Sequence, residues 1–367
     1  MRQHTNGTRP TSDSYDTIVV GAGPAGIMAA LGASRRGSVL LVDSVSLPRD
    51  KSCGGMLHEL TQGYLARFGE LPEEIVLEPR HVNFRYVDWD RGIRKATALR
   101  FVNVDRAGFD HWLTSLLPAS VEVIGLCPLV SFSQGDDRVT VTLRASDGLA
   151  DITCANLVGA DGARSTVRRA LGIGDALSYV TLQDYVHLEG RIEPYFDCIY
   201  MRDIGDEFAY AYVVPKGDVA IVGSVFYPKT KRPGDKQDQV LDTLRRSMPQ
   251  LGESLRREAC AALYLRSTAD TVPGDGRVLL AGEAGGFMSP TSGEGISYAT
   301  HSGIAAGDAI AASTPDEALG AYAASVDGLR RDIRRRLRWL PFMESSAGKY
   351  LAGFVPTSIV SKVTTGL

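Results

Sequence analysis

A chain of 367 residues is long for one compact core, so its length predicts two lobes. Its 40 basic and 43 acidic side chains leave a formal net charge of -3. Without a basic surplus or a recognisable nucleic-acid motif, we expect no nucleic-acid partner. The five cysteines are odd in number and widely scattered, which argues against a disulfide framework or a metal site and favours a reducing compartment.

The ends of the chain and its hydropathy predict a cytoplasmic protein. Residues 1–14 are polar and lack the apolar core of a signal peptide, so we expect a disordered tail there. No apolar run reaches the roughly 18 residues that a membrane-spanning helix needs.

A glycine turn follows the first predicted strand. Tyr15–Val20 (YDTIVV) is typical of a buried parallel strand, and the turn GAGPAG leads from it into a helical segment. Gly21 permits a tight turn, Gly23 lets a pyrophosphate approach the backbone, and Gly26 lets the helix lie close to the strand. The free N–H groups at the start of the helix then face the anion.

An acidic residue ends the next strand. Ser38–Val42 is apolar and is followed by Asp43, about 20 residues after the glycine turn. An acid at this place accepts hydrogen bonds from an unphosphorylated ribose, as in FAD or NAD. A tight turn without a ligand is the alternative, but strand, glycines, helix, strand and acid in this order favour a dinucleotide site.

Three later segments favour FAD over NAD. Arg277–Ile310 is typical of a buried strand, a glycine loop and a second small-residue turn that opens a long helix. That turn, Gly293-Glu294-Gly295, can aim backbone N–H groups at a reduced flavin, which carries negative charge around its pyrimidine ring. Leu157–Leu171 is a strand that ends in Asp161-Gly162 before a helix, and Arg106 stands at the start of a further helix.

These motifs resemble a known superfamily. The first glycine turn, Asp161-Gly162 and the region of Gly282-Glu283 are similar to the flavoprotein monooxygenases with the hydroxybenzoate-hydroxylase fold. Cys53-Gly54-Gly55, Tyr210–Gly223 and Pro290–Ala299 resemble the geranylgeranyl reductase branch, and the resemblance covers roughly residues 15–325. It implies an α/β fold (α+β overall), in which a Rossmann-like FAD-binding domain is joined to an antiparallel-sheet substrate domain and a C-terminal helical segment.

The resemblance also implies FAD as the cofactor and the residues that hold it. Asp43 would bind the adenosine ribose, Arg106 and Glu283 would lie near the pyrophosphate or ribityl chain, and Gly293–Ile296 would lie under the flavin ring. Leu129 would contact adenine through its backbone. The complete set of implied FAD contacts is Gly21, Gly23, Pro24, Ala25, Gly26, Asp43, Ser44, Cys53, Gly54, Gly55, Arg106, Leu129, Asp161, Gly282, Glu283, Pro290, Gly293, Glu294, Gly295 and Ile296.

Two positions depart from the reductase pattern. Gly282-Glu283 replaces the usual Gly-Asp, so the acid is one methylene longer. Tyr210–Pro215 (YAYVVP) replaces a Tyr-x-Trp-x-Phe-Pro pattern at the presumed substrate wall. The same stretch also lacks both tryptophans of the Trp-x-Trp-x-Ile-Pro pattern of flavin-dependent halogenases, which argues against halogenation.

Changes of pattern along the chain predict the domain boundaries. Residues 81–99 and 176–261 alternate between apolar and polar positions, as strands of an antiparallel substrate domain do. Residues 15–80, 100–175 and 262–325 then form a discontinuous FAD-binding domain. The aromatic residues of the second lobe predict an apolar or aromatic substrate, with sheet-face packing as the alternative; they are Tyr185, Tyr195, Tyr200, Phe208, Tyr210, Tyr212, Phe226 and Tyr227.

The C-terminal segment, residues 326–367, contains an arginine-rich helix. In Arg330–Leu340 (RRDIRRRLRWL), an apolar stripe of Leu329, Ile333, Leu337 and Leu340 opposes a face of arginines. A solvated helix packed on the flavin lobe is one interpretation, and peripheral contact with an anionic membrane surface is the other. The last residues, 341–367, are mildly apolar and can cover the mouth of the substrate cavity.

The stretch DKSCGGMLHE (residues 50–59) contains one cysteine beside two glycines. We expect this loop to run toward the flavin, where a backbone pressed against a planar ring leaves little room for Cβ atoms. Cys53 is then a candidate proton donor, because a free thiol is mostly protonated at neutral pH. A small apolar spacer is the alternative. Tyr210 and Tyr212 are the other catalytic candidates.

Three functions remain open from the sequence. The first is reduction of a carbon–carbon double bond in an apolar, prenyl or polyene-like substrate by hydride transfer from reduced flavin. The second is hydroxylation of an aromatic or secondary-metabolite substrate by a monooxygenase. The third is a non-catalytic flavin protein for redox sensing or electron relay. No second nucleotide domain is visible, so the electron donor would be a transiently bound NAD(P)H or a ferredoxin-like protein.

Overall fold

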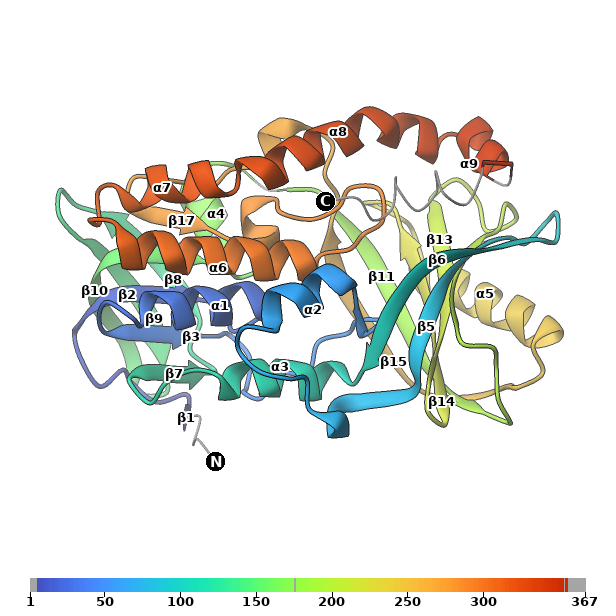
Figure 1. The fold of residues 1–367 in the computed structure, drawn as a ribbon, viewed down its shortest axis with the longest axis horizontal. Helices are drawn as coiled ribbons and strands as arrows, with labels where there is room; N and C mark the ends of the chain where they lie inside the picture. The colour runs from blue at the N-terminus through green and yellow to red at the C-terminus, as the bar shows by residue number, and fades with distance from the viewer. Residues whose placement is uncertain (1–4, 175, 353, 356–367) are drawn as a thin grey trace.

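The computed structural model describes residues 5–174, 176–352 and 354–355 and contains two β-sheets that lie side by side (Figure 1). The first sheet, sheet A, belongs to the lobe that the sequence predicts to bind FAD, named the FAD-binding lobe for that prediction, and follows the order β1-β7-β3-β2-β10-β17-β16, with β8 and β9 attached beside β10. Its strands are β1 (Thr5–Asn6), β2 (Ser14–Val20), β3 (Val39–Val42), β7 (Val121–Gly125), β8 (Leu129–Gln134), β9 (Val139–Ala145), β10 (Gly148–Gly159), β16 (Gly274–Asp275) and β17 (Val278–Leu280).

The central strands of sheet A run parallel and are buried on both faces. Val19 and Leu41 point into a core shared with the helices, whereas Ile18 and Leu40 point into a second core under the β8–β9 hairpin. Alternate residues of each strand therefore meet different layers, which explains why these strands are apolar throughout rather than at every second position.

Helices cover the first of these faces (Figure 1). Helix α1 lies directly against α6, and a Cβ added at Gly303 would approach the carbonyl oxygen of Ala25 to 2.2 Å. Small residues therefore let the two helix backbones pack closely. The helices of this lobe are α1 (Pro24–Ala33), α2 (Glu59–Leu65), α3 (Arg106–Ser115), α4 (Thr166–Ala170), α6 (Ile296–Ala312) and α7 (Ala318–Ser325), and α4 alone of these packs on the β8–β9 side.

Sheet B forms the second lobe in the order β15-β11-β14-β13-β12-β5-β6-β4. The sequence predicts an antiparallel sheet, and the pairs are antiparallel except that β12 runs parallel to β5. One face packs under α5 (Pro233–Ser247) and the other faces the cavity described below. The strands are β4 (Met56–Leu57), β5 (Val76–Asp88), β6 (Ile93–Val104), β11 (Ser178–Leu188), β12 (Tyr195–Tyr200), β13 (Phe208–Lys216), β14 (Val219–Phe226) and β15 (Leu251–Leu263).

The prediction of a disordered tail over residues 1–14 is wrong for its described part. Thr5–Asn6 pairs with β7 as an edge strand, and Gly7 donates its N–H to the carbonyl oxygen of Gly125. The Asn6 side chain and Leu47 exchange two hydrogen bonds. A polar segment of this kind becomes ordered because its backbone and side-chain amide groups form hydrogen bonds at the edge of a sheet. Hydropathy does not measure the free energy gained from those hydrogen bonds.

Two C-terminal helices cross from one lobe to the other (Figure 1). Helix α8 (Asp327–Glu344) buries Leu329, Ile333 and Leu340 of the predicted stripe, whereas Leu337 is half-buried. Helix α9 (Ser346–Ala352) reaches the β5–β6 hairpin, where the Tyr86 hydroxyl donates to the carbonyl oxygen of Lys349. Among the described residues, none of the helices combines the length and apolar character that a membrane crossing requires.

Candidate functional site

A cavity of about 1060 Å³ lies between the two lobes and takes residues from both. The FAD-binding lobe contributes the first glycine turn, the loop at residues 49–55 and the turn before α6. Sheet B contributes an aromatic wall, and the C-terminal helices contribute Trp339, Phe342 and Lys349. A cavity of this size, apolar on one side and rich in backbone amides on the other, can hold a large planar ligand.

The first glycine turn is shaped to receive an anion. A Cβ added at Gly21, whose φ is 107°, would lie 2.3 Å from the carbonyl oxygen of Ala160. A Cβ at Gly26 would lie 1.7 Å from the carbonyl oxygen of Gly21, so both positions require glycine. Helix α1 begins at Pro24 without a side-chain cap. Its free amides, together with the cavity-lining Gly23 and Ala25, fit a pyrophosphate.

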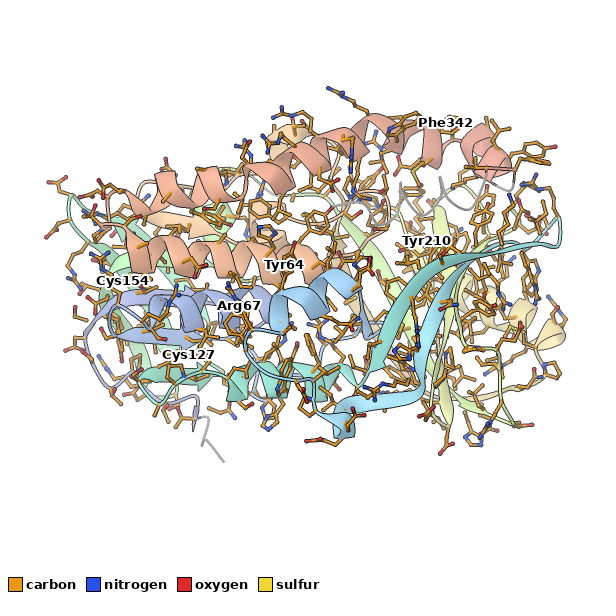
Figure 2. The ribbon with its side chains drawn as sticks, viewed as in Figure 1. Tyr64, Arg67, Cys127, Cys154, Tyr210 and Phe342 are labelled. Atoms are coloured by element: carbon orange, nitrogen blue, oxygen red, sulfur yellow. The ribbon has the colours of Figure 1, made fainter. Side chains whose placement is uncertain are left out.

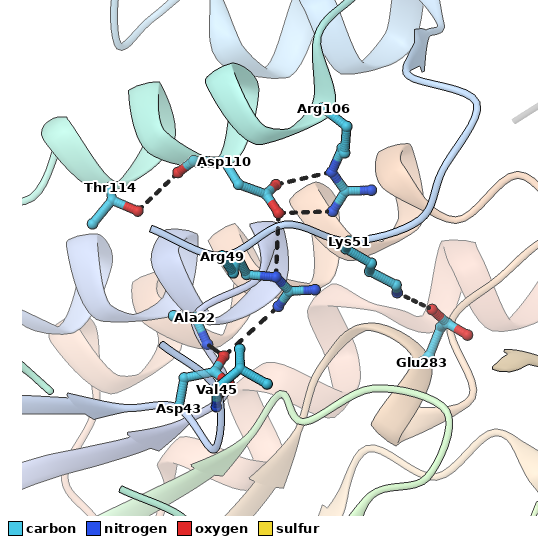
Figure 3. Close-up of polar contacts among 9 residues, drawn as sticks. All are labelled: Ala22, Asp43, Val45, Arg49, Lys51, Arg106, Asp110, Thr114 and Glu283. Carbon is cyan, nitrogen blue, oxygen red and sulfur yellow. Dashed lines mark hydrogen bonds and ion pairs between the residues drawn. The ribbon is translucent and has the colours of Figure 1, made fainter. Parts of the chain in front are cut away.

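An ion-pair network follows the glycine turn (Figure 3). The Ala22 amide donates to Asp43 at 2.7 Å, and Arg49 lies 3.7 Å from the Asp43 carboxylate and 3.3 Å from that of Asp110. Asp110 is buried and also binds Arg106 at 3.0 Å. The network therefore connects the predicted ribose acceptor, Asp43, to the predicted pyrophosphate contact, Arg106.

The sequence reasoning missed Arg49. Its Nη1 atom lies 2.9 Å from the point where a Cβ on Gly23 would be, so the guanidinium lies over the glycine turn. Arg49 also lines the cavity, and a cation at this place fits a bound pyrophosphate. Its only local signal is its position six residues after Asp43 in a loop, which is too weak to single it out.

The remaining predicted contacts on the FAD-binding lobe also line the cavity, and two of their carboxylates have internal partners. Asp161 accepts hydrogen bonds from the Thr166 and Val167 amides, so it caps α4. Glu283 accepts from the Leu263 amide at 2.9 Å and pairs with Lys51 at 3.3 Å, as Figure 3 shows for Lys51. The cavity-lining residues of this group are Ser44, Leu129, Asp161, Gly282, Glu283 and Pro290.

The turn before α6 lines the cavity at residues 293–296, close to sheet B. A Cβ at Gly293 would lie 3.2 Å from the Tyr210 hydroxyl. The Glu294 carboxylate accepts from the Ser297 amide at 2.8 Å, at the start of the helix. Burial raises the pKa of Glu294, although the amides of Ser297 and Ile296 and the charge of Arg336 oppose that shift.

The structure gives Gly55 of the Cys-Gly-Gly loop a reason that differs from the predicted one. Gly55 has a φ of 61°, and an added Cβ would lie 2.3 Å from the carbonyl oxygen of Val104 and 2.6 Å from Lys216 Nζ. Among the described residues, an added Cβ at Gly54 would meet nothing closer than Phe196, at 3.8 Å, so the predicted approach of this glycine to the flavin stays a prediction. The protein's own backbone, rather than a planar ligand, therefore requires Gly55.

Lys216, which the sequence reasoning also missed, holds this loop from behind. Its Nζ donates to the carbonyl oxygens of Gly55 at 3.1 Å and Val104 at 2.9 Å. Burial lowers the pKa of Lys216 to about 7, although the charges of Cys53 and Asp105 oppose that shift. A buried amine with two backbone acceptors thus anchors the segment that carries Cys53.

Cys53 is the one thiol of the five whose pKa is lowered. Burial alone would raise the pKa of Cys53, but the Arg106 guanidinium, the Gly55 amide and Lys51 outweigh it. Burial dominates at Cys198 and Cys260, which also line the cavity, and raises the pKa of both. Cys127 and Cys154 lie in the other lobe, far from Tyr210 (Figure 2).

Sheet B presents an aromatic wall to the cavity. Phe196 stacks on Tyr212 with ring centroids 5.4 Å apart and on Phe84 at 5.9 Å, with interplanar angles of 12° and 18°. The Tyr212 hydroxyl binds the Gln183 side chain, and Gln183 accepts from Ser52 Oγ at 2.6 Å. Tyr212, a predicted catalytic residue, is therefore connected to the loop of Cys53.

The other aromatic residues of the second lobe divide between its two faces. Tyr200, Tyr210 and Tyr227 line the cavity with Tyr212. Phe208 and Phe226 belong to the core under α5, so for these two the packing interpretation is correct. Among the described residues, no group of three or more histidine, cysteine or acidic side chains is arranged to hold a metal ion.

Comparison with known proteins identifies the family. Residues 119–336 match the family described as the FAD binding domain. The chain belongs to this FAD-binding family. The flavoprotein is also 32% identical over 302 residues to protein CbrA of Escherichia coli O157:H7, an alignment that covers 79% of this chain and 82% of CbrA.

Solved structures show that the flavoprotein shares its fold with proteins of several reaction types. A geranylgeranyl bacteriochlorophyll reductase-like protein from Thermoplasma acidophilum superposes with a TM-score of 0.79 at 19% identity, covering 97% of this chain and 92% of that one. CmlS, a flavin-dependent halogenase, gives a TM-score of 0.73 at 20% identity, with 92% and 65% covered. The predicted fold class and the FAD cofactor are confirmed, and the protein is an FAD-dependent oxidoreductase. The individual FAD contacts stay predictions.

Proposed function

We propose that this flavoprotein reduces a carbon–carbon double bond in an apolar substrate of the prenyl or polyene type. The observation that carries the proposal is the Cys53 thiol, which lines the cavity and has a lowered pKa beside Arg106. Reduction of an alkene requires a hydride at one carbon and a proton at the other. An acidified thiol at the cavity wall is suited to donate that proton.

The chain's own groups support each part of this reaction. The glycine turn, Arg49 and the start of α6 would hold FAD, which supplies the hydride when it is bound and reduced. The S–H bond of Cys53 breaks as the proton passes to carbon, and the thiolate that remains is stabilised by Arg106 and Lys51. The stacked wall of Phe84, Phe196 and Tyr212 orients an extended apolar chain and excludes water.

The same wall also supports a second candidate, a monooxygenase that hydroxylates an aromatic substrate. Parallel rings of this kind stack well on a flat aromatic molecule. In either case we propose NAD(P)H, bound transiently, or a ferredoxin-like protein as the electron donor.

Anaerobic reduction followed by reoxidation distinguishes the two candidates. The purified holoprotein is reduced without oxygen and mixed with candidate polyenes, and the flavin absorbance near its oxidised maximum is followed together with product mass. We expect reoxidation by an alkene and a product two mass units heavier. Product formed only with oxygen and an aromatic substrate, sixteen mass units heavier, would establish the monooxygenase instead.

Replacement of Cys53 tests the proton-donor role separately. Cys53→Ala is expected to slow product formation by roughly 100-fold or more, because a positioned general acid contributes about that much. Cys260→Ala is the matched control, since Cys260 lines the same cavity with a raised pKa and is expected to change the rate by less than about threefold. Unchanged turnover in Cys53→Ala would show that Cys53 only packs in the loop and donates no proton.

A further inference from the structure

Exposed apolar side chains gather at the C-terminal end of the described chain. Eleven large apolar side chains are strongly exposed among the described residues, and five of them lie between positions 339 and 354. We name this group the C-terminal apolar patch; it consists of Trp339, Phe342, Tyr350, Leu351 and Phe354. A concentration of this kind on one short segment marks an interaction surface more often than scattered single residues do.

Two members of the patch, Trp339 and Phe342, lie at an opening of the cavity. Trp339 is 56% exposed and Phe342 is 45% exposed, yet both line the cavity, so the cavity reaches the surface between them. Gly348 and Lys349 of α9 line it as well. An apolar molecule that enters or leaves here passes between Trp339 and Phe342 of the C-terminal apolar patch.

A row of arginines leads along α8 to this opening. Arg331, Arg335, Arg338 and Phe342 are spaced i, i+4, i+7 and i+11, which places them on one face of the helix. The opposite face holds the buried Leu329, Ile333 and Leu340. Helix α8 runs along the outer edge of the molecule, with Phe342 near its C-terminal end (Figure 2).

The arginines of this row remain open to solvent. Arg331 pairs with Asp327 and Arg335 with Asp332, but their side chains are still 70% and 61% exposed. Arg338 is also exposed. Their guanidinium groups therefore remain accessible to a further anion.

We propose that the arginine row and the C-terminal apolar patch dock this protein on an anionic lipid surface, with the cavity opening facing the lipids. Aromatic side chains insert at the boundary between headgroups and acyl chains, and arginines bind the phosphates above it. The charge pattern selects this occupant, because a second copy placed symmetrically on the same face would bring two arginine rows together. The proposal does not depend on which reaction the flavin performs.

Docking in this orientation solves a transfer problem for an apolar ligand. Transfer of a polyene from lipid into water costs roughly 25 cal/mol per Å² of apolar surface that becomes exposed. An opening that touches the bilayer lets such a ligand reach the aromatic wall without crossing water. The location of the exposed aromatics at the cavity opening, rather than elsewhere on α8, follows from that arrangement.

Vesicle flotation tests the proposal directly. The FAD-loaded protein is mixed with phosphatidylcholine vesicles containing or lacking 30% phosphatidylglycerol, at low and high salt, and the bound fraction is measured. We expect binding to the anionic vesicles at low salt, at least tenfold weaker binding without phosphatidylglycerol, and loss of binding at high salt. The triple variant Arg331→Gln, Arg335→Gln, Arg338→Gln should bind about 100-fold more weakly.

Variants of the C-terminal apolar patch test the insertion of aromatic side chains into the lipid separately from the charge of the arginine row. Trp339→Glu with Phe342→Glu should abolish flotation, whereas the control pair Leu149→Glu with Leu255→Glu, exposed elsewhere, should not change it. Equal binding of the wild-type protein to both kinds of vesicle, or no binding, overturns the proposal. A dimer seen by analytical ultracentrifugation that is lost in the patch variant would assign the surface to self-association. Since no substrate is present, failure here leaves the proposed reaction unaffected.

Discussion

At the scale of single residues, buried basic side chains fix the segments that line the cavity. Lys216 is buried with two carbonyl acceptors, a number that suits a neutral amine, and its pKa falls to about 7 because burial disfavours the ammonium. Arg49 and Arg106 share the buried carboxylate of Asp110. These contacts position the loop of Cys53 and the glycine turn before any ligand arrives.

Lys216 predicts a pH dependence of stability with a definite sign. Between about pH 7 and the ordinary lysine pKa of 10.5, the unfolded chain binds a proton that the folded chain has released. The free energy of unfolding therefore rises with pH across this window, by at most about 1.4 kcal/mol per unit from this group. Urea unfolding of the apoprotein from pH 7 to 10 should show this rise for the wild type and lose it in Lys216→Met.

The control for this measurement is Lys231→Met, at an exposed position. Its unfolding free energy should keep the wild-type dependence on pH. A Lys216→Met profile parallel to the wild type would show that Lys216 keeps its proton in the folded protein.

Arg49 predicts a loss of cofactor affinity. Arg49→Gln removes a charge that lies over the glycine turn, so the Kd for FAD should rise by roughly 10- to 100-fold. Asp43 keeps the Ala22 amide and Asp110 keeps Arg106, so the fold should survive. Quenching of flavin fluorescence on titration measures the change, and Arg67→Gln, an exposed arginine outside the cavity lining, should retain wild-type affinity.

At the scale of elements, local sequence patterns predicted more than long-range contacts. Strand β2, the glycine turn after it and strand β3 before Asp43 could be predicted because their signals are contiguous. Strands β11 to β14 could also be predicted, because their side chains point alternately into one of two apolar clusters, one on each face of sheet B. Local patterns could not predict the roles of Arg49 and Lys216 or the parallel pairing of β5 with β12. Each of these depends on partners far away in the sequence.

The Cys-Gly-Gly loop offers a matched pair of substitutions. Gly55→Ala forces a side chain into a left-handed conformation and against Val104, so it should cost roughly 1–3 kcal/mol from the backbone alone. Gly54→Ala has room for its Cβ and should be nearly neutral in the free energy of unfolding. Thermal unfolding of the two apoproteins compares them, and an equal loss in both would show that Gly55 is no more constrained by its surroundings than Gly54.

At the scale of the whole molecule, the cavity makes the two lobes one ligand-binding unit. Residues from sheet A, sheet B and the C-terminal helices all line it. FAD should therefore stabilise the whole chain by about 2.7 kcal/mol at a free concentration of 100 times its Kd. Calorimetry should show one transition that moves to higher temperature with added FAD. Two transitions, of which FAD shifts only one, would mean that the lobes unfold separately.

The order of strands in sheet A has a consequence for synthesis on the ribosome. Strand β2 is made near the beginning of the chain, but β17 and the turn that opens α6 come only after residue 277. A nascent chain therefore carries the first glycine turn long before it has the rest of the cofactor cradle, and α8 and α9 emerge later still. Cofactor loading and closure of the cavity therefore have to wait for about the last quarter of translation, and until then the exposed glycine turn and the unpaired β10 edge need protection.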